Sequence, residues 1–425
     1  MLASQQGDFK MGKKIWIWNH YATNMYIDQA GRHYSFAENL LKEGYSPTIF
    51  CASTNHFSKQ NIDTKGNKYI TDTVNDIPFV FVKSPKYTGN GIKRLLNMVT
   101  FFINLFPVAK KYAKINNKPD VIFASSVHPL TLVAGIMVAK KFGVPCICEI
   151  RDLWPESIIA YGLLKRNSFI AKIMFKGEKW IYQKADYIIM TWEGGKDYII
   201  DQGWEKFVDL SKIKHISNGV DLDMFDRNSN EYCLNDSDLE SNNYKNIVYA
   251  GSIRKVNNIG MLLDVAKIIQ NKGYNQIRFL IYGSGNELEM LKKRCKDEGI
   301  NNVLFKGRVE KKYIPYILKR AYVNILHNTS TTLNKYGQSQ NKLFEYLAAG
   351  RCIVQTYSTG YNIIKKYNCG LTTKKQNAEE IAKVVIEACM NEEMNKLMGQ
   401  NARLAAFEFD YKVLTSKLIS IIDDI

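Results

Sequence analysis

Ser339-Gln340-Asn341-Lys342-Leu343-Phe344-Glu345-Tyr346-Leu347-Ala348-Ala349-Gly350, followed by the apolar run Cys352-Ile353-Val354, is the stretch that decides the fold of this chain. Its apolar residues recur at helical spacing and Gly350 is a typical helix stop, so a helix is predicted after a polar loop. The start of such a helix favours a bound anion, and Lys342 adds a positive charge there. One turn later, Glu345 is placed to accept hydrogen bonds from the two hydroxyls of a ribose. The alternative interpretation is that Glu345 only complements the helix start.

Apolar runs alternate with helical patterns along the whole chain, which is typical of parallel sheets flanked by helices. A chain of 425 residues exceeds the usual limit of a single core, so two domains are expected. The predicted strands are 15–18, 48–50, 121–124, 145–150 and 187–190 in the first half, and 247–250, 278–282, 303–305, 323–326 and 352–354 in the second. The predicted organisation is a disordered extension (1–11), two Rossmann-like domains (12–213 and 214–405) and a final helix (406–425).

The stretch around Lys342 resembles the nucleotide-sugar motif of family 4 retaining glycosyltransferases, which have the two-domain GT-B fold. Residues 341–346 with Ala349-Gly350 are most similar to the subgroup that builds bacterial O-antigen and capsule repeats, including N-acetylfucosamine transferases. In that family a pair of carboxylates brackets the loop: the second grips the ribose and the first touches the donor sugar. Glu345 matches the second. Gly337 stands at the first position, so that contact is absent or is made by Gln338 or Gln340.

This resemblance covers residues 13–422. It implies an α/β GT-B fold with the nucleotide site in the cleft between the two domains and a C-terminal helix that crosses back to the first. It also implies a retaining hexosyl- or N-acetylhexosaminyl-type transferase, which moves a sugar from a UDP-sugar to a polyprenyl-linked or glycan acceptor in O-antigen or capsule synthesis. Rival interpretations are a UDP-sugar 2-epimerase of the same fold and a non-catalytic membrane- or glycan-binding scaffold.

Further donor-binding residues are predicted at glycine turns and cations that follow the strands. In the family an arginine directly follows the first glycine of the second domain, and here Ser252 occupies that position. Arg254 and Lys255 are the candidates to replace it on the diphosphate, with solvated loop charges as the alternative. Gly31 either lets a phosphate approach a helix start or is a plain tight turn. The complete predicted donor set is Gly31, Gly251, Arg254, Lys255, Gly283, Arg308, Val309, Asn341, Lys342 and Glu345.

Charged residues also cluster directly after a buried strand in the segment Glu149-Ile150-Arg151-Asp152-Leu153-Trp154-Pro155-Glu156. This is the edge at which doubly wound sheets bind ligands. We predict that Asp152 orients the acceptor hydroxyl or the donor sugar and that Arg151 offsets phosphate charge. His128, after the preceding strand, is predicted to contact the acceptor. The alternatives are an ion pair between Arg151 and a nearby carboxylate, and a purely structural His128.

The net charge of +17 is unevenly placed, because no Asp or Glu occurs between Lys83 and Pro119. Within this segment, residues 92–109 read as an apolar helix flanked by cations and too short to span a bilayer. Such a helix suits the surface of an anionic leaflet; the alternative is a core helix with solvated lysines. The predicted membrane contacts are Lys93, Arg94, Lys110 and Lys111. Nucleic acid is not an expected partner, since no nucleic-acid-binding motif is present.

Eight cysteines lie mostly inside apolar runs, and their spacing fits neither a disulfide framework nor a metal cluster. The thiols of Cys146 and Cys148 are expected to point to opposite faces of their strand. No metal and no cofactor are expected, and the pair Asp221 and Asp223 resembles an interdomain segment of the family. Without a recognisable secretory signal, the expected location is the reducing cytoplasm, peripheral at the inner face of the plasma membrane.

Overall fold

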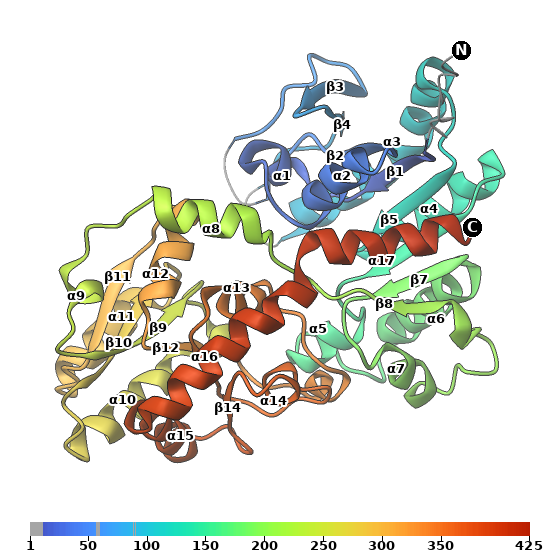
Figure 1. Ribbon diagram of the computed structural model, residues 1–425. Helices are drawn as coiled ribbons and strands as arrows, with labels where there is room; N and C mark the ends of the chain where they lie inside the picture. Colours follow the sequence, from blue (N-terminus) through green and yellow to red (C-terminus); the bar gives the residue numbers. More distant parts are fainter. Residues whose placement is uncertain (1–11, 57–59, 88, 90) are drawn as a thin grey trace, which may run out of the picture. The chain divides into compact units, whose positions relative to one another are not determined.

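The computed structural model describes residues 12–56, 60–87, 89 and 91–425 (Figure 1). The disordered extension predicted for residues 1–11 lies outside these residues. The chain divides into two compact units. The first contains the residues up to Thr191, Gly195–Ile216 and Thr415–Ile425, and the second contains Trp192–Gly194 and Ser217–Leu414. The main division therefore falls three residues after the predicted boundary at 213.

The first unit is built on an eight-stranded sheet in the order β3-β4-β2-β1-β5-β6-β7-β8. The strands are β1 Lys14–Trp18, β2 Ser46–Ala52, β3 Tyr69–Val74, β4 Ile77–Val82, β5 Val121–Ser125, β6 Cys146–Ile150, β7 Tyr187–Met190 and β8 Ile213–His215. All neighbours pair in parallel except β3 and β4. The side chains of β5 and β6 are buried on both faces, as expected of central parallel strands covered by helices.

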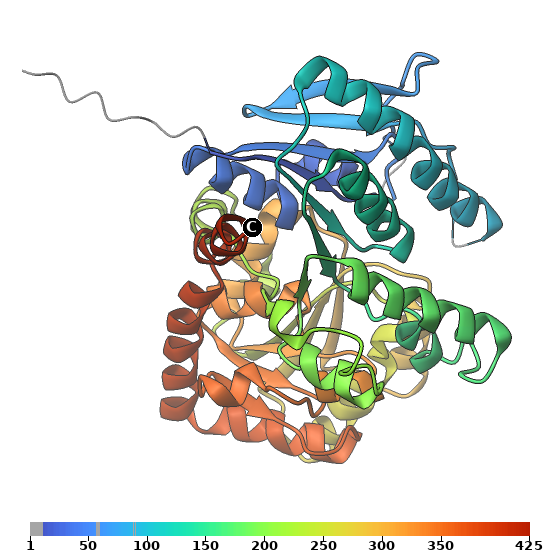
Figure 2. The same ribbon diagram turned by 90° about the vertical axis from the view of Figure 1, so that its right-hand side faces the viewer.

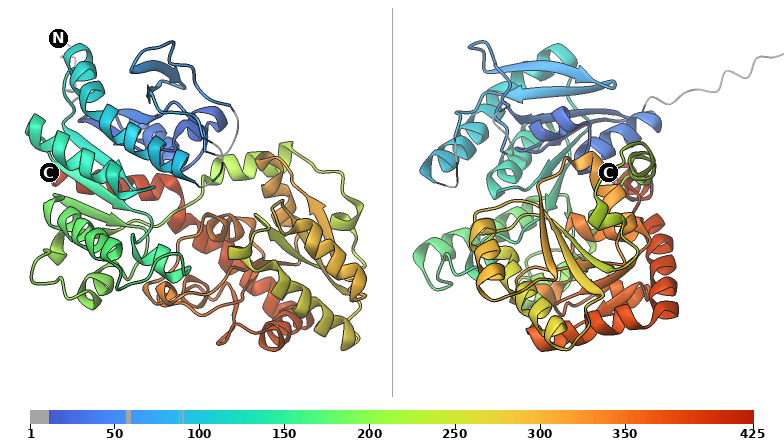
Figure 3. Two further views of the ribbon diagram at one scale, coloured as in Figure 1. Left: turned by 180° about the vertical axis from the view of Figure 1, so that it is seen from behind. Right: turned by 90° about the vertical axis from the view of Figure 1, so that its left-hand side faces the viewer.

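Helices cover both faces of this sheet. They are α1 Thr23–Asp28, α2 Arg32–Lys42, α3 Ile92–Asn116, α4 Pro129–Phe142, α5 Glu156–Ala160, α6 Phe169–Lys184 and α7 Gly195–Asp201, with the short turn η1 Leu210–Lys212. On one face, α3, α4 and α6 lie side by side (Figure 3). Gly135 lets α4 approach β5 closely, because a Cβ at this position would lie 2.7 Å from the Cβ of Ala124.

The second unit holds a six-stranded, fully parallel sheet in the order β11-β10-β9-β12-β13-β14. Its strands are β9 Lys245–Ala250, β10 Ile277–Tyr282, β11 Val303–Gly307, β12 Val323–Leu326, β13 Cys352–Gln355 and β14 Gly370–Thr372. Its helices are α8 Leu222–Glu231, α9 Ser237–Glu240, α10 Ile259–Asn271, α11 Leu288–Asp297, α12 Ile314–Arg320, α13 Asn341–Ala349, α14 Ile363–Lys366, α15 Ala378–Met390 and α16 Glu392–Ala406. One hydrophobic core lies on each face of the sheet. In Figure 2, α13 packs against α16.

The final helix, α17 Tyr411–Asp423, follows the short turn Phe407–Phe409. It starts in the second unit, and from Thr415 onward it belongs to the first. Its carboxyl end is tied to the amino-terminal sheet of that unit, where Lys13 Nζ donates to the carbonyl of Ile422 at 2.6 Å. The Tyr45 hydroxyl donates to Asp423 Oδ1 at 2.8 Å.

All of the predicted strands form, and the predicted fold class of two Rossmann-like α/β domains is confirmed. The sequence analysis missed β3, β4, β8 and β14. It overlooked the turn between β3 and β4, where Asn75 and Asp76 both have positive φ (48° and 61°), as a tight hairpin requires. The polar segment 230–243, between the two units' predicted strands, carries the end of α8 and the short helix α9.

Two further expectations are wrong. Residues i and i+2 of a strand share a face, so the thiols of Cys146 and Cys148 lie together, with their Sγ atoms 3.9 Å apart. The helix predicted for 92–109 runs for 25 residues, because Val108, Ala109 and Tyr112 continue its buried face past Pro107. By length and composition α3 could cross a membrane, and a third (33%) of its apolar window is buried in the first unit.

Candidate functional site

The predicted anion-binding helix start forms at the beginning of α13. The first N–H groups of a helix have no intrahelical acceptor, and no side chain of the described residues caps this helix. Leu343, Phe344 and Leu347 are buried and fix the helix against the second unit's core. Lys342 and Glu345 are only partly buried and Asn341 is exposed, so these three side chains stay on the accessible face.

The ammonium group of Lys342 lies over the turn that follows β9. Its Nζ is 3.2 Å from the hydroxyl of Tyr249 and 4.3 Å from the centre of that ring. A Cβ at Gly251 would lie 2.8 Å from the same Nζ, so a larger residue would displace the ammonium group. Burial lowers the pKa of Lys342 to about 8, against the smaller opposing effect of Glu345. The structure therefore brings together two residues of the predicted donor set, Lys342 and Gly251.

Three glycines meet at the carboxyl ends of β9, β10 and β11. The N–H of Gly251 donates to the carbonyl of Tyr282 at 2.9 Å, and the N–H of Gly283 donates to the carbonyl of Gly307 at 2.7 Å. A Cβ at Gly283 would lie 1.8 Å from the carbonyl oxygen of Gly251, so no other residue fits there. These turns leave a backbone-lined surface beside Lys342, at the sheet edge where doubly wound folds bind ligands.

Glu345 has a carboxylate without a partner. It forms no hydrogen bond or ion pair within 12–56, 60–87, 89 and 91–425. Burial raises its pKa, while the nearby charges of Lys311 and Lys342 act in the opposite direction. A partly buried carboxylate of this kind is stabilised when a ligand supplies hydrogen-bond donors, since leaving it unpaired is costly.

The remaining cations predicted to bind the donor are exposed. Arg254 and Lys255 form the turn before α10, and Arg254 lies close enough to Tyr249 to affect the pKa of that phenol. Ser252, in the position of the family's arginine, is held by Asn257, whose Nδ2 donates to the Ser252 hydroxyl at 2.6 Å. Arg308 is also exposed, directly after Gly307.

Val309, also in the predicted donor set, has a partly buried side chain that packs against the core beside α13.

Gly337 explains the missing first carboxylate of the family motif. Its φ of 109° is a conformation that residues with a side chain rarely adopt, so a glutamate would be strained at this position. Gln338 does not replace it freely, because its amide donates to Gln355 Oε1 at 2.8 Å and accepts from the Tyr357 hydroxyl at 3.1 Å. Gln340 Oε1 accepts a hydrogen bond from the same Tyr357 hydroxyl at 3.1 Å.

The sequence analysis did not assign a role to Tyr249 or His327. His327 directly follows β12 and is fully buried, with its Nδ1 2.6 Å from the Thr356 hydroxyl and its Nε2 2.9 Å from the carbonyl of Asn258. Burial lowers its pKa to about 4, so it is neutral, and Lys342 is close enough to contribute to this shift. The sequence feature that could have identified His327 as a site residue is its position directly after a predicted strand.

In the first unit, the turn at Gly31 is held by a buried polar network. Gly31 has a φ of 113° and precedes α2. Arg32 Nε donates to Glu149 Oε1 at 2.7 Å, and His33 Nε2 lies 2.9 Å from Glu149 Oε2. The Ser125 hydroxyl donates to the same oxygen at 2.6 Å. The two side chains after Gly31 therefore anchor the turn inside the unit.

The charged cluster after β6 separates into structural and accessible groups. Glu149 belongs to the buried network, and its pKa is lowered by Arg32 and His33 against the opposing effect of burial. Glu156 is buried and paired with Arg166. Arg151 and Asp152 form no ion pair with each other, which removes one alternative interpretation of this pair.

The backbone N–H of Arg151 donates to the Ser126 hydroxyl at 2.9 Å, so the loops after β5 and β6 are joined. The buried Nε of Arg151 has no partner among the described residues. Asp152 is exposed. The roles predicted for both residues in binding remain predictions.

His128 begins α4 and is buried at the same edge. Its Nε2 lies 2.6 Å from His20 Nδ1, and His20 Nε2 lies 2.7 Å from Asn97 Oδ1 on α3. His20 and Asn97 carried no assignment in the sequence analysis. The amino-acid pattern gives no signal for this contact, which depends on β1, β5 and α3 meeting in the fold.

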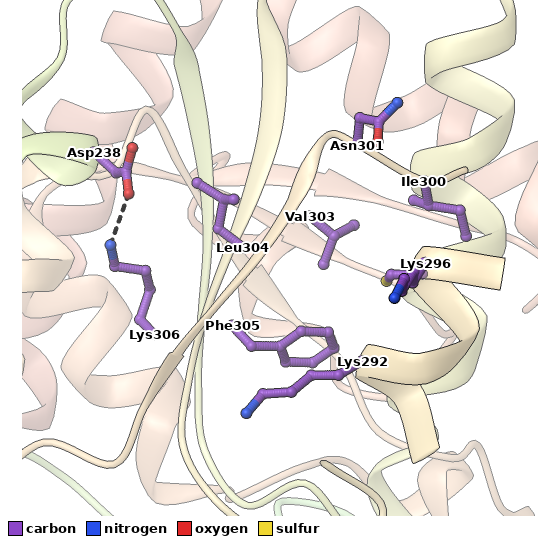
Figure 4. A pocket seen from close by; sticks show the side chains of 10 residues that line it. Asp238, Lys292, Lys296, Ile300, Asn301, Val303, Leu304, Phe305 and Lys306 are labelled. Atoms are coloured by element: carbon purple, nitrogen blue, oxygen red, sulfur yellow. Dashed lines mark hydrogen bonds and ion pairs between the residues drawn. The ribbon is translucent and has the colours of Figure 1, made fainter. Parts of the chain in front are cut away.

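In the described part of the chain, no group of three or more His, Cys, Asp or Glu side chains could hold a metal ion. Asp221 caps α8 by accepting from the N–H of Met224 at 2.8 Å, and Asp223 pairs with Lys412 at 2.6 Å. An open cavity of about 420 Å³ lies along α11 and the edge strand β11 (Figure 4). None of the predicted donor-binding residues lines it, and its Lys306 is paired with Asp238 at 2.8 Å.

Comparisons with known proteins cover both halves of the chain. Residues 32–224 match the family model described as Glycosyltransferase Family 4, and residues 235–405 match the model Glycosyl transferases group 1. An uncharacterized glycosyltransferase of Methanocaldococcus jannaschii is 26% identical over 231 residues, which is 53% of this chain and 55% of that protein. The chain thus spans about half the length of this relative.

Two solved structures have the same fold over nearly the whole chain. Sucrose-phosphate synthase from Thermosynechococcus elongatus aligns with a TM-score of 0.71 at 15% identity, covering 97% of this chain and 98% of that one. Anabaena HepE, solved in complex with UDP, aligns with a TM-score of 0.68 at 12% identity, covering 97% and 100%. These similarities establish a two-domain GT-B fold with parallel sheets.

Proposed function

We propose that this GT-B chain, in which a Glycosyltransferase Family 4 half precedes a Glycosyl transferases group 1 half, transfers a sugar from a UDP-sugar to a hydroxyl of a lipid-linked or glycan acceptor. The transfer retains the anomeric configuration and serves bacterial O-antigen or capsule synthesis, as the resemblance of the motif at 341–350 implies. The donor sugar is a hexose or an N-acetylhexosamine.

The observation that carries this proposal is that Lys342 and the unpartnered Glu345 lie on the same accessible face of α13. Lys342 and the helix start supply positive charge for a diphosphate, and the unpartnered Glu345 supplies an acceptor for the ribose hydroxyls. The glycine turns at Gly251, Gly283 and Gly307 leave backbone groups accessible beside them. The complex of Anabaena HepE with UDP supports UDP as the nucleotide.

The proposed transfer reaction requires no nucleophile from the protein. The acceptor hydroxyl attacks the anomeric carbon as the bond to UDP breaks, and its proton passes to the departing diphosphate. Lys342 and the start of α13 stabilise the negative charge that grows on this group, which lowers the barrier because this charge is larger in the transition state than in the bound donor. Asp152 orients the reacting hydroxyl or the donor sugar, and Arg151 adds positive charge. No metal ion or cofactor takes part.

The protein acts at the inner face of the plasma membrane, where polyprenyl-linked acceptors are presented. On α3, Ile92, Leu95, Leu96 and Ile103 are between 56% and 86% exposed, and Lys93, Lys110 and Lys111 are exposed as well. Exposed apolar residues next to cations suit an anionic leaflet. Arg94 contributes less than predicted, because it is partly buried and its Nε donates to the Tyr21 hydroxyl at 2.9 Å.

A panel of UDP-sugars incubated with purified protein and a crude extract of polyprenyl-linked lipids tests the proposal, with products identified by mass spectrometry. We expect one UDP-sugar to yield a glycosylated lipid whose new linkage keeps the donor's anomeric configuration. Conversion of a UDP-sugar to its 2-epimer without acceptor would show the rival epimerase. UDP binding without turnover of any donor would favour the non-catalytic scaffold.

A further inference from the structure

A buried chain of polar side chains runs from α3 to the carboxyl edge of the first unit's sheet. His20 follows β1 and His128 follows β5, and these two strands are neighbours. Asn97 lies on α3. All three side chains are buried, and they connect in the order Asn97, His20, His128 through contacts of 2.7 and 2.6 Å. The contacts among these three side chains determine which ring nitrogen of each histidine carries the proton.

The orientation of the Asn97 amide is set by its other contacts. Its Nδ2 donates to the carbonyl of Pro85 at 2.7 Å and to the Thr54 hydroxyl at 2.9 Å. A carbonyl oxygen can only accept, so the atom of Asn97 that faces Pro85 must be the nitrogen. The amide oxygen therefore faces His20, and His20 Nε2 must carry a proton to donate to it.

The tautomer of His128 follows from that of His20. Burial lowers the pKa of His20 well below its usual value and lowers that of His128 to about 3, so both rings are neutral and each carries one proton. With its proton on Nε2, His20 presents a bare Nδ1, to which His128 Nε2 must donate. His128 is left with an unprotonated Nδ1, which is buried and has no partner among the described residues.

Unpartnered polar atoms gather at this edge. Of the eight such buried side-chain atoms in the described residues, three lie on or just after β1, β5 and β6 and the fourth lies in the first turn of α4, which follows β5: Trp18 Nε1, His128 Nδ1, Arg151 Nε and Thr131 Oγ1. Unpaired buried polar groups are costly, so their concentration at one sheet edge indicates a place where a polar ligand completes their hydrogen bonds. The positive charge of Arg94, which contributes to the low pKa of His128, disfavours a cationic donor there.

We propose that His128 Nδ1 is a fixed hydrogen-bond acceptor for a hydroxyl group of a bound ligand, and that His20 and Asn97 are positioning residues that hold His128 in this tautomer. The ligand class is a polyol such as a sugar. If the chain is the transferase proposed above, this hydroxyl belongs to the sugar acceptor or donor, so this identification rests on the proposed function. The tautomer assigned to His128 is independent of the proposed function.

Nitrogen NMR of the full-length protein with ¹⁵N-labelled histidine tests the tautomers at neutral pH. We expect His20 and His128 each to show a protonated Nε2 and a bare Nδ1, with signals assigned from the variants His20→Gln and His128→Gln. Addition of the crude acceptor extract should move the Nδ1 signal of His128 and leave that of His327 in place. A protonated Nδ1 on His128, or an Nδ1 signal that the extract does not move, would overturn the proposal.

Two substitutions at one position separate a ligand contact from a structural role. An asparagine keeps an oxygen near the place of Nδ1, whereas a glutamine keeps an amide near the place of Nε2 and its contact with His20. We expect His128→Asn to be the less stable variant but to keep most of the transfer efficiency, and His128→Gln to lose about five- to tenfold, the usual effect of one hydrogen bond. If His128 had only a structural role, His128→Gln would keep more of the transfer efficiency than His128→Asn.

The nucleotide site provides the control, because it lies in the other unit. Calorimetric titration with UDP should give the same affinity for the wild type and both His128 variants. If UDP does not bind the wild type, the proposed function fails, while the NMR measurement still decides the tautomer. If UDP binds, transfer occurs and both variants match the wild type, the proposed role of His128 is wrong and the proposed function stands.

Discussion

Lys342 shows how burial makes an ordinary cation sensitive to pH. Its pKa falls from 10.5 to about 8 because the ammonium is partly desolvated beside Tyr249. Below pH 8 the charged form predominates, and the folded state bears the full cost of desolvating it. This cost disappears between pH 8 and 10.5, because there the folded state binds fewer protons than the unfolded state. From this group alone, the free protein becomes more stable as pH rises through that window.

Binding of UDP should show the opposite pH dependence. A diphosphate favours the charged Lys342, so the affinity for UDP is expected to fall as pH rises through 8. At pH 9 only about one tenth of Lys342 is charged in the free protein, which predicts roughly tenfold weaker binding than at pH 7. Calorimetric titration at both pH values measures this change. The variant Lys342→Met should bind weakly at both, and a wild-type affinity that does not vary with pH would contradict the assignment.

Glu345 should matter for the nucleotide and not for folding. We expect Glu345→Ala to weaken UDP binding by about 1 to 3 kcal/mol, the range for losing charge-assisted hydrogen bonds to the ribose. Thermal stability should not fall, since the carboxylate has no partner among the described residues and burial already raises its pKa. Titration of wild type and variant with UDP checks this prediction. Equal affinities would leave Glu345 as a residue that only complements the helix start.

Asp152 is expected to act on a different ligand. Because its proposed partners are the acceptor and the sugar, Asp152→Asn should leave UDP affinity nearly unchanged and lower transfer by at least about tenfold. The variant Glu156→Gln is a matched control for charge, although it should lower stability because Glu156 is buried and paired with Arg166. Measurement of transfer rates beside UDP titrations separates the effects. Wild-type turnover in Asp152→Asn would refute its role in the reaction.

At the scale of an element, α3 combines two tasks. Phe101 and Leu105 are fully buried and hold the helix against the unit, and Asn97 on the same face orients the histidine pair. The opposite face carries exposed apolar residues and lysines. A helix that only packed against the core would not need apolar residues on its exposed face. The exposed apolar residues of α3 therefore favour a contact between this face and another surface.

Replacing Lys93, Lys110 and Lys111 with Gln should weaken binding to anionic vesicles by up to about 3 kcal/mol, near 1 kcal/mol for each cation. Arg94 is left unchanged because its contact with Tyr21 would confound the result. Flotation with anionic liposomes at low salt measures the effect, and added salt should weaken the wild type in the same direction. The control replaces the exposed Lys292, Lys293 and Lys296 of α11. Equal loss in both variants would show that only net charge matters.

At the scale of the whole molecule, α17 makes the stability of the first unit depend on the end of the chain. The unit includes Thr415–Ile425, in which Leu418 and Ile422 are fully buried. Truncations that remove the last helix are therefore expected to affect the amino-terminal sheet, although that sheet is complete in sequence long before the helix begins.

Leu418→Ala should lower the free energy of unfolding by about 2 to 5 kcal/mol, the usual range for a fully buried leucine. Hydrogen exchange should quicken first in β1 and β2 of the first unit, because Lys13 and Tyr45 next to these strands bond to the end of α17. The control Leu397→Ala removes a side chain that is 52% exposed, and it should change little. Faster exchange confined to the second unit would contradict this dependence.

The sequence by itself determined the elements and the fold class. Apolar runs predicted ten of the strands, because parallel strands that are buried on both faces leave a continuous apolar signal. The interior strand β4 carries a similar apolar run and was missed. Residues 341–350 predicted α13 with Lys342 and Glu345 one turn apart, since helical spacing is a local property. Gly251 and Gly283 were also predicted, and at Gly283 the carbonyl oxygen of Gly251 leaves no room for a side chain.

The tertiary structure alone decided which polar groups are free to act. In the charged cluster after β6, only contacts from distant elements distinguish Glu149, paired with Arg32, from the accessible Asp152. The backbone conformation at Gly337, which would strain a residue with a side chain, was not visible in the pattern. The contacts of His20 with Asn97 and with His128 join residues 77 and 108 positions apart. Such pairings arise when β1, β5 and α3 pack together, and local periodicity carries no information about them.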